Sequence, residues 1–402
     1  MQNNKLSQRT VVVLGFLVYF FSYAMRLDYS ATMVAMVADL KITNTLASYA
    51  VTGSFITYGI GQVFCGIIAD KISPVKMIKY AMIGTIAVNI LVSFCSDMAV
   101  ITLLWCINGL CQAMVWAPLA RFVLENVGKE KYADSITIVG LAASICTLFI
   151  YLFVSFVLEI TVWRIVFRCM SFFGTVILFI WCYITRNVVI GKVVDVKQPI
   201  TDNKYSVLKV VALAGLVPIF SVIMFQGVLR DGIQTWLPSL VNERFGLKAS
   251  SSVLSTTILP ILGMVSVIIT NALYLKLKNE LKTVSVVFAV AFAATIPFVL
   301  GLKTPALLTI IFASVASGCM HGVNHILISI LPQNFAKYGR FAAFSGINGG
   351  CSYLGASVSS FGFAALADNV GWNAVQTSWC VIAGLATLIC VLKIKSWAKF
   401  RG

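Results

Sequence analysis

Apolar residues occur along this chain in long blocks, separated by short polar connections. Each block has roughly 20 or more mostly apolar residues, which is enough for a helix to cross the hydrocarbon core of a bilayer. Twelve such spans are predicted, at residues 10–34, 45–69, 75–95, 98–122, 133–158, 163–185, 208–238, 250–275, 283–302, 304–330, 340–366 and 372–394. The pattern therefore predicts an all-α integral membrane protein with twelve transmembrane helices.

The composition supports this interpretation and excludes a soluble protein. Of 402 residues, 59% are hydrophobic and 11% are charged, whereas soluble domains carry about 25% charged residues. The run Val11–Phe21 resembles the core of a signal peptide, but Ser22-Tyr23-Ala24 is a poor cleavage site, so we interpret it as part of the first span. The eleven cysteines show no C-x-x-C spacing and lie mostly in apolar stretches, which predicts packing residues.

The formal net charge of +16 is distributed between alternate connections. With twelve spans both termini lie on one side, and that side carries 22 of the 30 Lys and Arg residues, against six on the other. This asymmetry predicts that both termini are cytoplasmic. The cations form no continuous stripe, so nucleic-acid binding is disfavoured.

One connection, from Arg186 to Lys209, is both long and polar, and it divides the spans into six and six. We predict an N-terminal six-helix bundle at 1–190, a cytoplasmic linker at 191–207 and a C-terminal six-helix bundle at 208–402. Paired bundles are typical of secondary transporters, whose substrate site lies near the midplane between the halves. No ATP-binding motif or catalytic constellation is present, so the sequence predicts a transporter driven by gradients rather than an enzyme.

Two cations, Arg26 and Arg230, fall inside predicted spans, one in the first span of each half. A charge there is costly unless it faces a wet cavity or a counter-charge. The guanidinium fork matches carboxylate or phosphate oxygens, so the pair predicts a two-arginine anion clamp between the halves. Asp28 and Asp231 lie close by and are expected to act as counter-ions or proton acceptors; alternatively, they neutralise the arginines, which then only tie helices together.

Several segments carry recognisable motifs: Tyr58-Gly59-x-x-Gln62-x-x-x-Gly66-x-x-x-Asp70-Lys71-x-Ser73-Pro74, Tyr23-x-x-Arg26, Gly109-x-x-Gln112-x-x-x-Trp116-x-Pro118-x-x-Arg121, Leu229-Arg230-x-Gly232-x-x-x-Trp236-x-Pro238, Gly346-x-Asn348 and Tyr353-Leu354-Gly355. These motifs resemble those of the major facilitator superfamily, and in particular of the organophosphate:phosphate antiporters such as the glycerol-3-phosphate and hexose-phosphate transporters. The resemblance runs over most of the chain and implies the major facilitator fold.

The resemblance also implies roles for single residues. Arg26 and Arg230 would bind the phosphate of the substrate, and Tyr23, Tyr58 and Trp116 would line the cavity. These five residues are therefore expected at the substrate site.

A cytoplasmic gate is the second element that the resemblance implies. Asp70, Lys71 and Arg121 would form it, because charges at helix ends can pair across a closed interface and separate when it opens. The alternative is simple anchoring by the positive-inside rule.

Four positions depart from the glycerol-3-phosphate transporters. Gln62 replaces a lysine, Leu27 followed by Asp28 replaces a basic residue, an apolar residue near Ala143 replaces a histidine, and Gly227 replaces a tyrosine. The site is thus less positive, and a monoanion such as a sugar acid or other carboxylate is an alternative to a phosphate ester. Gln62 stays a candidate substrate-binding residue.

The two histidines, His321 and His325, are four residues apart and share one face of the tenth span. A substrate or proton role and a buried hydrogen-bonded role are both open, while no third metal ligand is evident. Gln226 and Asn324 are candidate partners for substrate hydroxyls, and Tyr353 is a further candidate substrate-binding residue.

Taken together, the residues predict a secondary active transporter of a small organic anion that works by alternating access. Sugar phosphate exchange for inorganic phosphate and proton-coupled symport of a sugar acid or carboxylate are both open, and a transporter-like membrane sensor is the alternative of another class. The expected partners are the small anion, the lipid bilayer, and protons or phosphate as coupling ions. We expect a monomer without cofactor or metal, in the cytoplasmic (inner) membrane.

Overall fold

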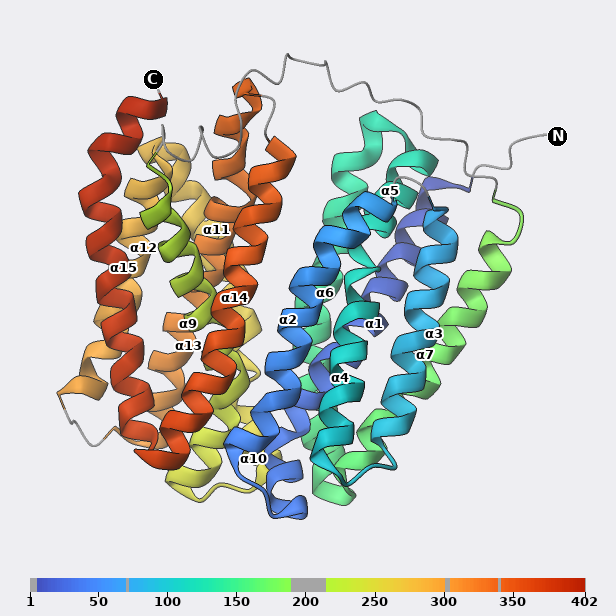
Figure 1. Ribbon diagram of the computed structural model, residues 1–402, viewed down its shortest axis with the longest axis horizontal. Helices are drawn as coiled ribbons and strands as arrows, with labels where there is room; N and C mark the ends of the chain where they lie inside the picture. Colours follow the sequence, from blue (N-terminus) through green and yellow to red (C-terminus); the bar gives the residue numbers. More distant parts are fainter. Residues whose placement is uncertain (1–5, 70–71, 189–214, 301–303, 339–340, 402) are drawn as a thin grey trace. The chain divides into compact units, whose positions relative to one another are not determined.

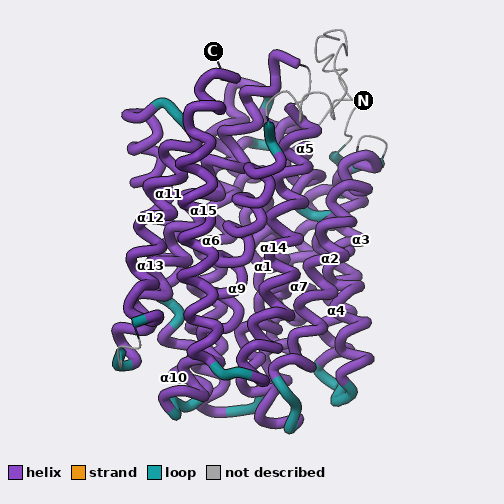
Figure 2. Tube along the Cα trace, turned by 60° about the vertical axis from the view of Figure 1, so that its left-hand side comes forward, coloured by secondary structure: helices purple, strands orange, loops and turns teal. Residues whose placement is uncertain are grey.

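The computed structural model describes residues 6–69, 72–188, 215–300, 304–338 and 341–401. Within these residues the secondary structure is helical, with short turns and no strands (Figures 1 and 2). The chain forms two compact units, each taken by itself below. The predicted bundle boundaries stay a prediction, and the predicted linker 191–207 lies outside the described residues.

Unit 1 holds the helices of the first half of the chain. They are α1 (Gln8–Leu40), α2 (Asn44–Ala69), α3 (Pro74–Val92), α4 (Met98–Ala113), α5 (Trp116–Val127), α6 (Lys129–Ile160) and α7 (Trp163–Thr185). The short helix α10 (Ala249–Ser255) belongs to unit 1 up to Leu254, while the start of α2, up to Ser48, belongs to unit 2.

Unit 2 holds the helices of the second half. They are α9 (Val217–Phe245), α11 (Ile258–Leu277), α12 (Glu280–Val299), α13 (Ala306–Asn324), α14 (Phe341–Asn369) and α15 (Trp372–Arg401). A π-helical segment η1 (His325–Ile330) and a 3-10 segment η2 (Leu331–Tyr338) follow α13.

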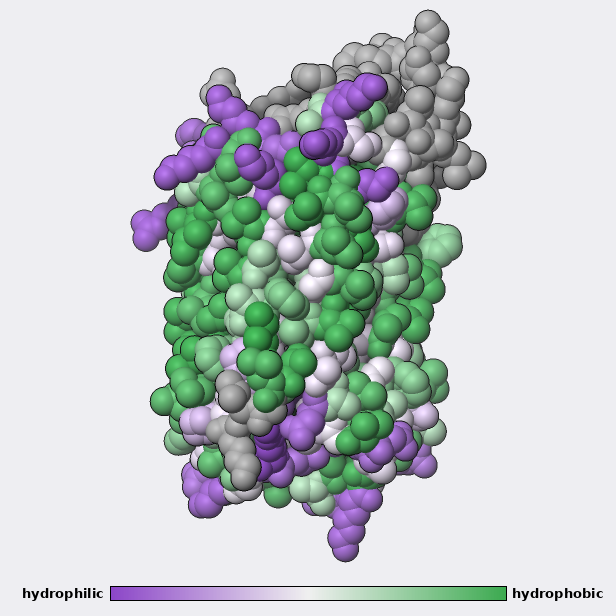
Figure 3. Space-filling view, turned by 90° about the vertical axis from the view of Figure 1, so that its left-hand side faces the viewer, coloured by the Kyte–Doolittle hydropathy of each residue, from purple (hydrophilic) through white to green (hydrophobic). Residues whose placement is uncertain are grey.

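The helices present apolar surface where a membrane protein meets lipid. In the described part of the chain, nine helical stretches are long and apolar enough to cross a membrane. Large apolar side chains face outward on them: Phe179 is 71% exposed and Leu392 is 69% exposed. Figure 3 shows an apolar surface across the middle of the face that carries α12 and α15, with hydrophilic side chains gathered at its two ends. This is the distribution expected where lipid replaces water as the solvent.

Side-chain caps explain where several helices begin. Ser7 accepts the Thr10 amide before α1, and Asp97 accepts the amides of Ala99 and Val100 before α4. Asn279 accepts the amide of Lys282 before α12. Each oxygen satisfies an N–H group that has no partner within its helix, so the sequence fixes these starts locally.

In three of the twelve predicted spans the regular α-helix is interrupted. The interruption lies four residues before a proline in each case: Met114 before Pro118, Thr256 before Pro260, and Ile328, within the π-helical segment, before Pro332. Proline has no N–H for the carbonyl four residues earlier, and its ring clashes with that carbonyl. The prediction considered apolar length alone and missed this effect.

The seventh span also differs from its predicted bounds of 208–238. The described helix α9 begins at Val217 and continues past Pro238 to Phe245. A proline inside a membrane helix is tolerated when neighbouring helices satisfy the freed backbone group. The helix stops where Gly246 adopts a left-handed conformation, with φ of 65°, and its N–H bonds the carbonyl of Asn242.

In unit 1, helix α1 lies at the centre and packs on α6 and α7. Aromatic side chains fill this core: the rings of Tyr29 and Trp105 lie 5.0 Å apart, and those of Phe122 and Trp181 lie 4.9 Å apart. Tyr29, Phe122 and Trp181 are fully buried. The face of α1 that carries Arg26 is thereby held in a fixed rotation.

In unit 2, glycines allow α9 and α14 to approach closely. A Cβ added at Gly227 would collide with the carbonyl oxygen of Ser352, and one at Gly355 would collide with that of Met224. Lipid gives no hydrophobic drive for helices to associate, so small residues that bring backbones together are a main source of packing energy. The two glycines therefore determine how closely Ser352 approaches α9.

The close approach predicts different outcomes for two glycines on α14. Gly355→Ala should lower the melting temperature of the purified protein in detergent, because overpacking typically costs about 1–3 kcal/mol. Gly362→Ala is the matched control, since a Cβ there meets nothing within 4 Å, and we expect no loss. Equal melting temperatures for the two variants would contradict the packing described here.

Candidate functional site

Helix α1 places Arg26 among aromatic rings. Its guanidinium carbon lies 4.1 Å from the ring centre of Tyr58, 5.7 Å from that of Tyr23 and 5.8 Å from that of Phe55. Tyr23 is one turn earlier on α1, and Phe55 and Tyr58 are one turn apart on α2. Ring faces attract a cation within about 6 Å of the ring centre, so all three contacts favour the charge of Arg26. Within unit 1 the structure brings together Arg26, Tyr23 and Tyr58; their role in substrate binding stays a prediction.

Gln62 joins the same group through Tyr58. Its Nε2 donates to the hydroxyl of Tyr58 at 3.0 Å, and the two residues are one turn apart on α2. Tyr58 is only 7% exposed. Gln62 therefore fixes the ring that covers Arg26, a positioning contact that the sequence did not reveal.

Trp116 reaches the group through a residue that the sequence analysis missed. Its ring lies 4.7 Å from that of Tyr19, which in turn lies 5.9 Å from that of Tyr23. Tyr19, Tyr23 and Arg26 are spaced four and three residues apart on α1, so they share one helix face. That spacing is the signal by which Tyr19 could have been found.

Three buried amides hold the backbone of α1 beside Arg26. Asn89 on α3 and Asn108 on α4 both donate to the carbonyl of Met25, at 3.3 and 3.0 Å. Gln112 donates to the carbonyl of Ser22 at 2.8 Å and accepts from its hydroxyl at 2.7 Å. These bonds bracket one turn of α1 and fix the position of the next residue, Arg26.

Asp28 lies in the interior of unit 1 and is fully buried. Its Oδ1 accepts the amide of Tyr29 at 2.8 Å, and its Oδ2 is buried with no hydrogen-bond partner in the described part of the chain. The ion pairs of the described residues do not include Asp28. Its role as a counter-ion of Arg26 stays a prediction.

Arg230 on α9 is held by polar side chains. Its Nε and Nη2 donate to the two carboxylate oxygens of Asp231 at 3.1 and 2.7 Å, and its Nη1 donates to Oδ1 of Asn324 at 2.6 Å. The side chains of Arg230 and Asp231 are 13% and 17% exposed. The structure thus places Arg230, Asp231 and Asn324 together, and Asp231 is the bonded counter-ion.

Ser352 extends this group across the α9–α14 contact. Its hydroxyl donates to Oε1 of Gln226 at 3.0 Å and lies 3.5 Å from Nη2 of Arg230. Gln226 also donates to the carbonyl of Met320 at 3.3 Å. Ser352 is the residue before the predicted candidate Tyr353, and the close packing at Gly227 and Gly355 brings it to α9. The role of Tyr353 stays a prediction.

The two histidines lie at the end of α13. The ring of His321 packs beside Gly263 of α11, where an added Cβ would meet it at 3.0 Å, and His321 is within electrostatic range of Arg230 and Asp231. His325 begins the π-helical segment, a feature that is frequent at functional sites. Within the described residues there is no group of three or more His, Cys, Asp or Glu side chains that could hold a metal ion.

Of the predicted gate, only Arg121 lies within the described residues; Asp70 and Lys71 are outside them. Arg121 donates to Glu125 at 2.7 Å and, through Nη1, to the carbonyl of Ile72 at 3.3 Å. It therefore lies beside the connection between α2 and α3, where the gate was predicted.

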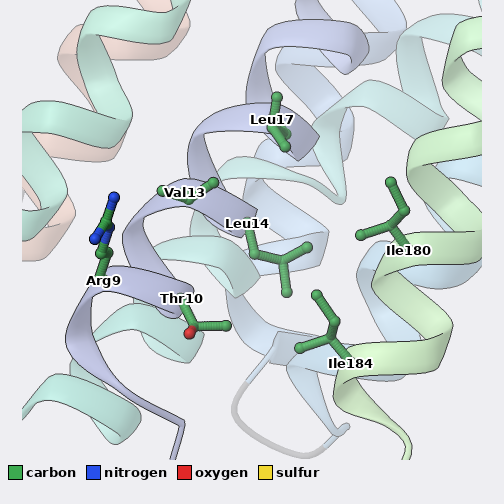
Figure 4. Close-up of a pocket in the computed structure, with 7 residues that line it drawn as sticks. All are labelled: Arg9, Thr10, Val13, Leu14, Leu17, Ile180 and Ile184. Atoms are coloured by element: carbon green, nitrogen blue, oxygen red, sulfur yellow. The ribbon is translucent and has the colours of Figure 1, made fainter.

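A separate pocket in unit 1 lies between the start of α1 and the end of α7 (Figure 4). Apolar side chains dominate its lining, which comprises Arg9, Thr10, Val13, Leu14, Leu17, Ile180 and Ile184. In the figure the Arg9 side chain extends away from Ile180 and Ile184. The pocket includes none of the residues grouped around Arg26, so it does not bear on the candidate site.

The sequence pattern of one protein family matches residues 12–360, which is most of the chain. The chain belongs to the Major Facilitator Superfamily. It is a multi-pass membrane transporter rather than an enzyme, and the predicted fold of twelve helices in two bundles is confirmed.

Curated relatives of this superfamily member match over shorter stretches. Two proteins named "Probable hexose phosphate transport protein" are similar to it: one from Chlamydia trachomatis, 31% identical over 118 residues, and one from Chlamydia pneumoniae, 24% identical over 151 residues. The matches cover 29% and 37% of this chain, and 25% and 33% of those relatives. The chain thus matches only a quarter to a third of the length of these relatives.

Solved structures share the fold of this superfamily member. A mutant of the nucleoside transporter NupG matches with a TM-score of 0.76 and 12% identity, over 96% of this chain and 100% of the other. The D-xylose–proton symporter matches with a TM-score of 0.69 and 13% identity, over 95% of each chain. At such identities the likeness concerns the fold alone.

The ring over Arg26 generates a stability prediction for two variants at one position. Tyr58→Phe keeps the ring and loses the bond to Gln62, whereas Tyr58→Leu loses both. Because a desolvated cation–π contact contributes about 0.5–2 kcal/mol, we expect a lower detergent melting temperature for Tyr58→Leu than for Tyr58→Phe. Tyr183→Leu is the control. Arg186 lies over the ring of Tyr183 in the same way, but Tyr183 is 67% exposed, so the decrease in melting temperature should be small. A Tyr58→Leu variant as stable as Tyr58→Phe would contradict the contact.

Proposed function

We propose that this transporter carries a small organic anion by alternating access, and that Arg26 and Arg230 bind the anion. The observation that carries the proposal is that each half holds one partly buried arginine among aromatic or polar side chains. Burying such charges is costly, and they are surrounded by groups that suit a polar ligand: tyrosines and a glutamine near Arg26, and Asn324, Ser352 and Gln226 near Arg230.

Each arginine suits an anion by its geometry as well as by its charge. A guanidinium is permanently charged and offers parallel N–H donors at the spacing of carboxylate or phosphate oxygens. In unit 1, the guanidinium carbon of Arg26 lies 4.1 Å from the ring centre of Tyr58, which attracts the cation. In unit 2, Asp231 accepts from Nε and Nη2 of Arg230 and Asn324 accepts from Nη1, so oxygen atoms already lie where those of a ligand would bind. A ligand with several oxygen atoms fits both environments.

Two substrate classes are supported by different observations. The names of the chlamydial relatives favour a phosphorylated sugar, and the resemblance to organophosphate:phosphate antiporters favours its exchange for inorganic phosphate. The departures at Gln62 and Gly227, together with the Arg230–Asp231 pair, favour a monoanion such as a sugar acid, taken up with protons. In both cases amide and hydroxyl groups around Arg230 would bind the hydroxyls of the substrate.

The membrane orientation and setting belong to the same proposal. The excess of Lys and Arg on one side supports cytoplasmic termini, and the bacterial relatives support the cytoplasmic membrane. Uptake into reconstituted vesicles distinguishes a carrier from a membrane sensor, since a sensor binds its ligand without moving it. A panel of sugar phosphates, sugar acids and dicarboxylates, each tested with and without phosphate inside, would identify the substrate.

The two-arginine proposal predicts loss of uptake in conservative variants. Arg26→Lys and Arg230→Lys should each remove most uptake in proteoliposomes, at least about tenfold, because a lysine ammonium cannot make parallel bonds to two oxygens. Arg164→Lys is a control, since Arg164 pairs with Asp39 at the end of the spans, and it should transport normally. Near-normal uptake in both lysine variants would eliminate the clamp.

Proton coupling is tested at Asp28. If its buried carboxylate carries the coupling proton, Asp28→Asn should keep exchange of internal for external substrate and lose uptake driven by an imposed pH gradient, because an amide takes up no proton in this range. The two assays are run on the same vesicle preparation, so a misfolded variant is recognised by loss of both. Unchanged gradient-driven uptake rejects the role.

A further inference from the structure

The counter-ion of Arg230 is bonded to it in the way that carboxylates bind guanidinium. Nε and Nη2 of Arg230 each donate to a different oxygen of Asp231, at 3.1 and 2.7 Å. This parallel arrangement is the one in which arginine binds a carboxylate or phosphate ligand. Asp231 therefore takes up the same two donors that an anionic substrate would use.

The bond joins neighbours in the sequence, which is unusual on a helix. Side chains at i and i+1 leave an α-helix about 100° apart and do not normally face each other; here the long Arg230 side chain turns back to reach Asp231. Because the two residues share one stretch of α9, no movement of one helix against another can separate them. The negative charge of Asp231 therefore stays close to Arg230 however the helices move, even when the side chains turn to admit a ligand.

The surrounding groups shown bonded to Arg230 are neutral. Asn324 accepts from Nη1 at 2.6 Å, and the Ser352 hydroxyl lies 3.5 Å from Nη2. The Arg230–Asp231 pair is itself neutral as a whole, and its side chains are 13% and 17% exposed, so water screens it little. This half of the site thus offers directed hydrogen bonds without a net positive charge.

We propose that Asp231 determines which anions are accepted: it cancels the charge of Arg230, so that the transporter selects monoanions and rejects phosphate dianions. The proposal rests on the proposed function and narrows its substrate to a hydroxyl-bearing carboxylate or similar singly charged molecule. A phosphate ester carries about −1.5 to −2 charges at pH 7. In a site of low dielectric, the second negative charge of the phosphate ester needs a second cation nearby. Arg230 would supply that positive charge, but Asp231 cancels it.

The experiment compares three sugars that differ in the group at carbon 6: glucuronate, a planar monoanion; glucose 6-sulfate, a tetrahedral monoanion; and glucose 6-phosphate, largely a tetrahedral dianion at pH 7.5. Binding of each is measured by the shift in melting temperature with ligand concentration. The wild-type protein is compared with Asp231→Asn, which removes the charge and keeps the shape, and with Asp231→Glu, which keeps the charge. Asp39→Asn is the matched control, because it also removes an aspartate bonded to an arginine, but far from the site along α1.

The expected result is a changed order of affinity among the three ligands and not a general loss of binding. Asp231→Asn should raise the affinity for glucose 6-phosphate relative to both monoanions by about tenfold or more, because the freed charge of Arg230 acts over a few ångströms at low dielectric. Asp231→Glu and Asp39→Asn should keep the wild-type order, with the two monoanions ahead of the dianion. A destabilised Asp231→Asn protein stays informative, since the dianion should then raise its melting temperature more than that of the wild type.

Three outcomes would overturn the proposal. The first is a wild-type protein that binds glucose 6-phosphate more tightly than the monoanions. The second is an Asp231→Asn variant with unchanged preference, while uptake still depends on Arg230; this rejects the role of Asp231 and leaves the proposed function standing. The third is absence of binding and uptake for every anion tested, in wild type and variants alike, which rejects the proposed function together with this inference.

Discussion

The charge of a guanidinium inside a membrane protein is the constraint on which the rest of this structure depends. Such a group has lost water and needs substitutes for it. The two units supply them differently: Arg26 lies against the faces of Tyr58, Tyr23 and Phe55, and Arg230 is bonded to Asp231 and Asn324. Ring faces attract a cation through their quadrupole, whereas a carboxylate binds it with an opposite charge. The two arginines therefore lie in different surroundings.

Helix packing in each unit serves to hold these groups in place. In unit 1, amides from α3 and α4 bond the carbonyls of Ser22 and Met25, so the backbone that carries Arg26 is fixed on both sides. In unit 2, Gly227 and Gly355 let the backbones of α9 and α14 meet, and that contact brings Ser352 to Gln226 and Arg230. Both arrangements use polar or small residues. Lipid is as apolar as the helix surfaces, so the burial of apolar side chains does not select one helix neighbour over another.

Prolines interrupt three of the helical spans, and two of these interruptions lie beside residues that belong to the groups around Arg26 and Arg230. The interruptions before Pro118, Pro260 and Pro332 free backbone groups that a regular helix would satisfy. One of them places Trp116 at the start of α5, beside the aromatic series that leads to Arg26. Another begins just after Asn324, the acceptor for Arg230. Irregular backbone thus occurs next to the residues grouped around Arg26 and around Arg230. In membrane proteins such backbone is tolerated where it is buried in protein or lines a cavity.

The sequence alone determined the all-α membrane fold, because a span needs only length and apolar character. It also identified Arg26, Arg230, Asp231 and Asn324, since a charge or its partner inside an apolar run is conspicuous on one chain. The tertiary structure decided how these residues are paired. Asp28 and Asp231 look equivalent in the sequence, each close after an arginine. Yet Asp28 is turned into the core of unit 1, while Asp231 binds its arginine.

Contacts across helices explain what the sequence could not show. Tyr19, Phe55, Ser352 and the amides of Asn89 and Asn108 are ordinary residues of membrane helices until their neighbours are known. Which neighbour each one meets depends on helix rotation and on the closeness of two backbones. Rotation follows from the buried rings around α1, and closeness follows from the two glycines between α9 and α14. The chain thus specifies its charges locally, and packing between helices decides which other side chains each of them meets.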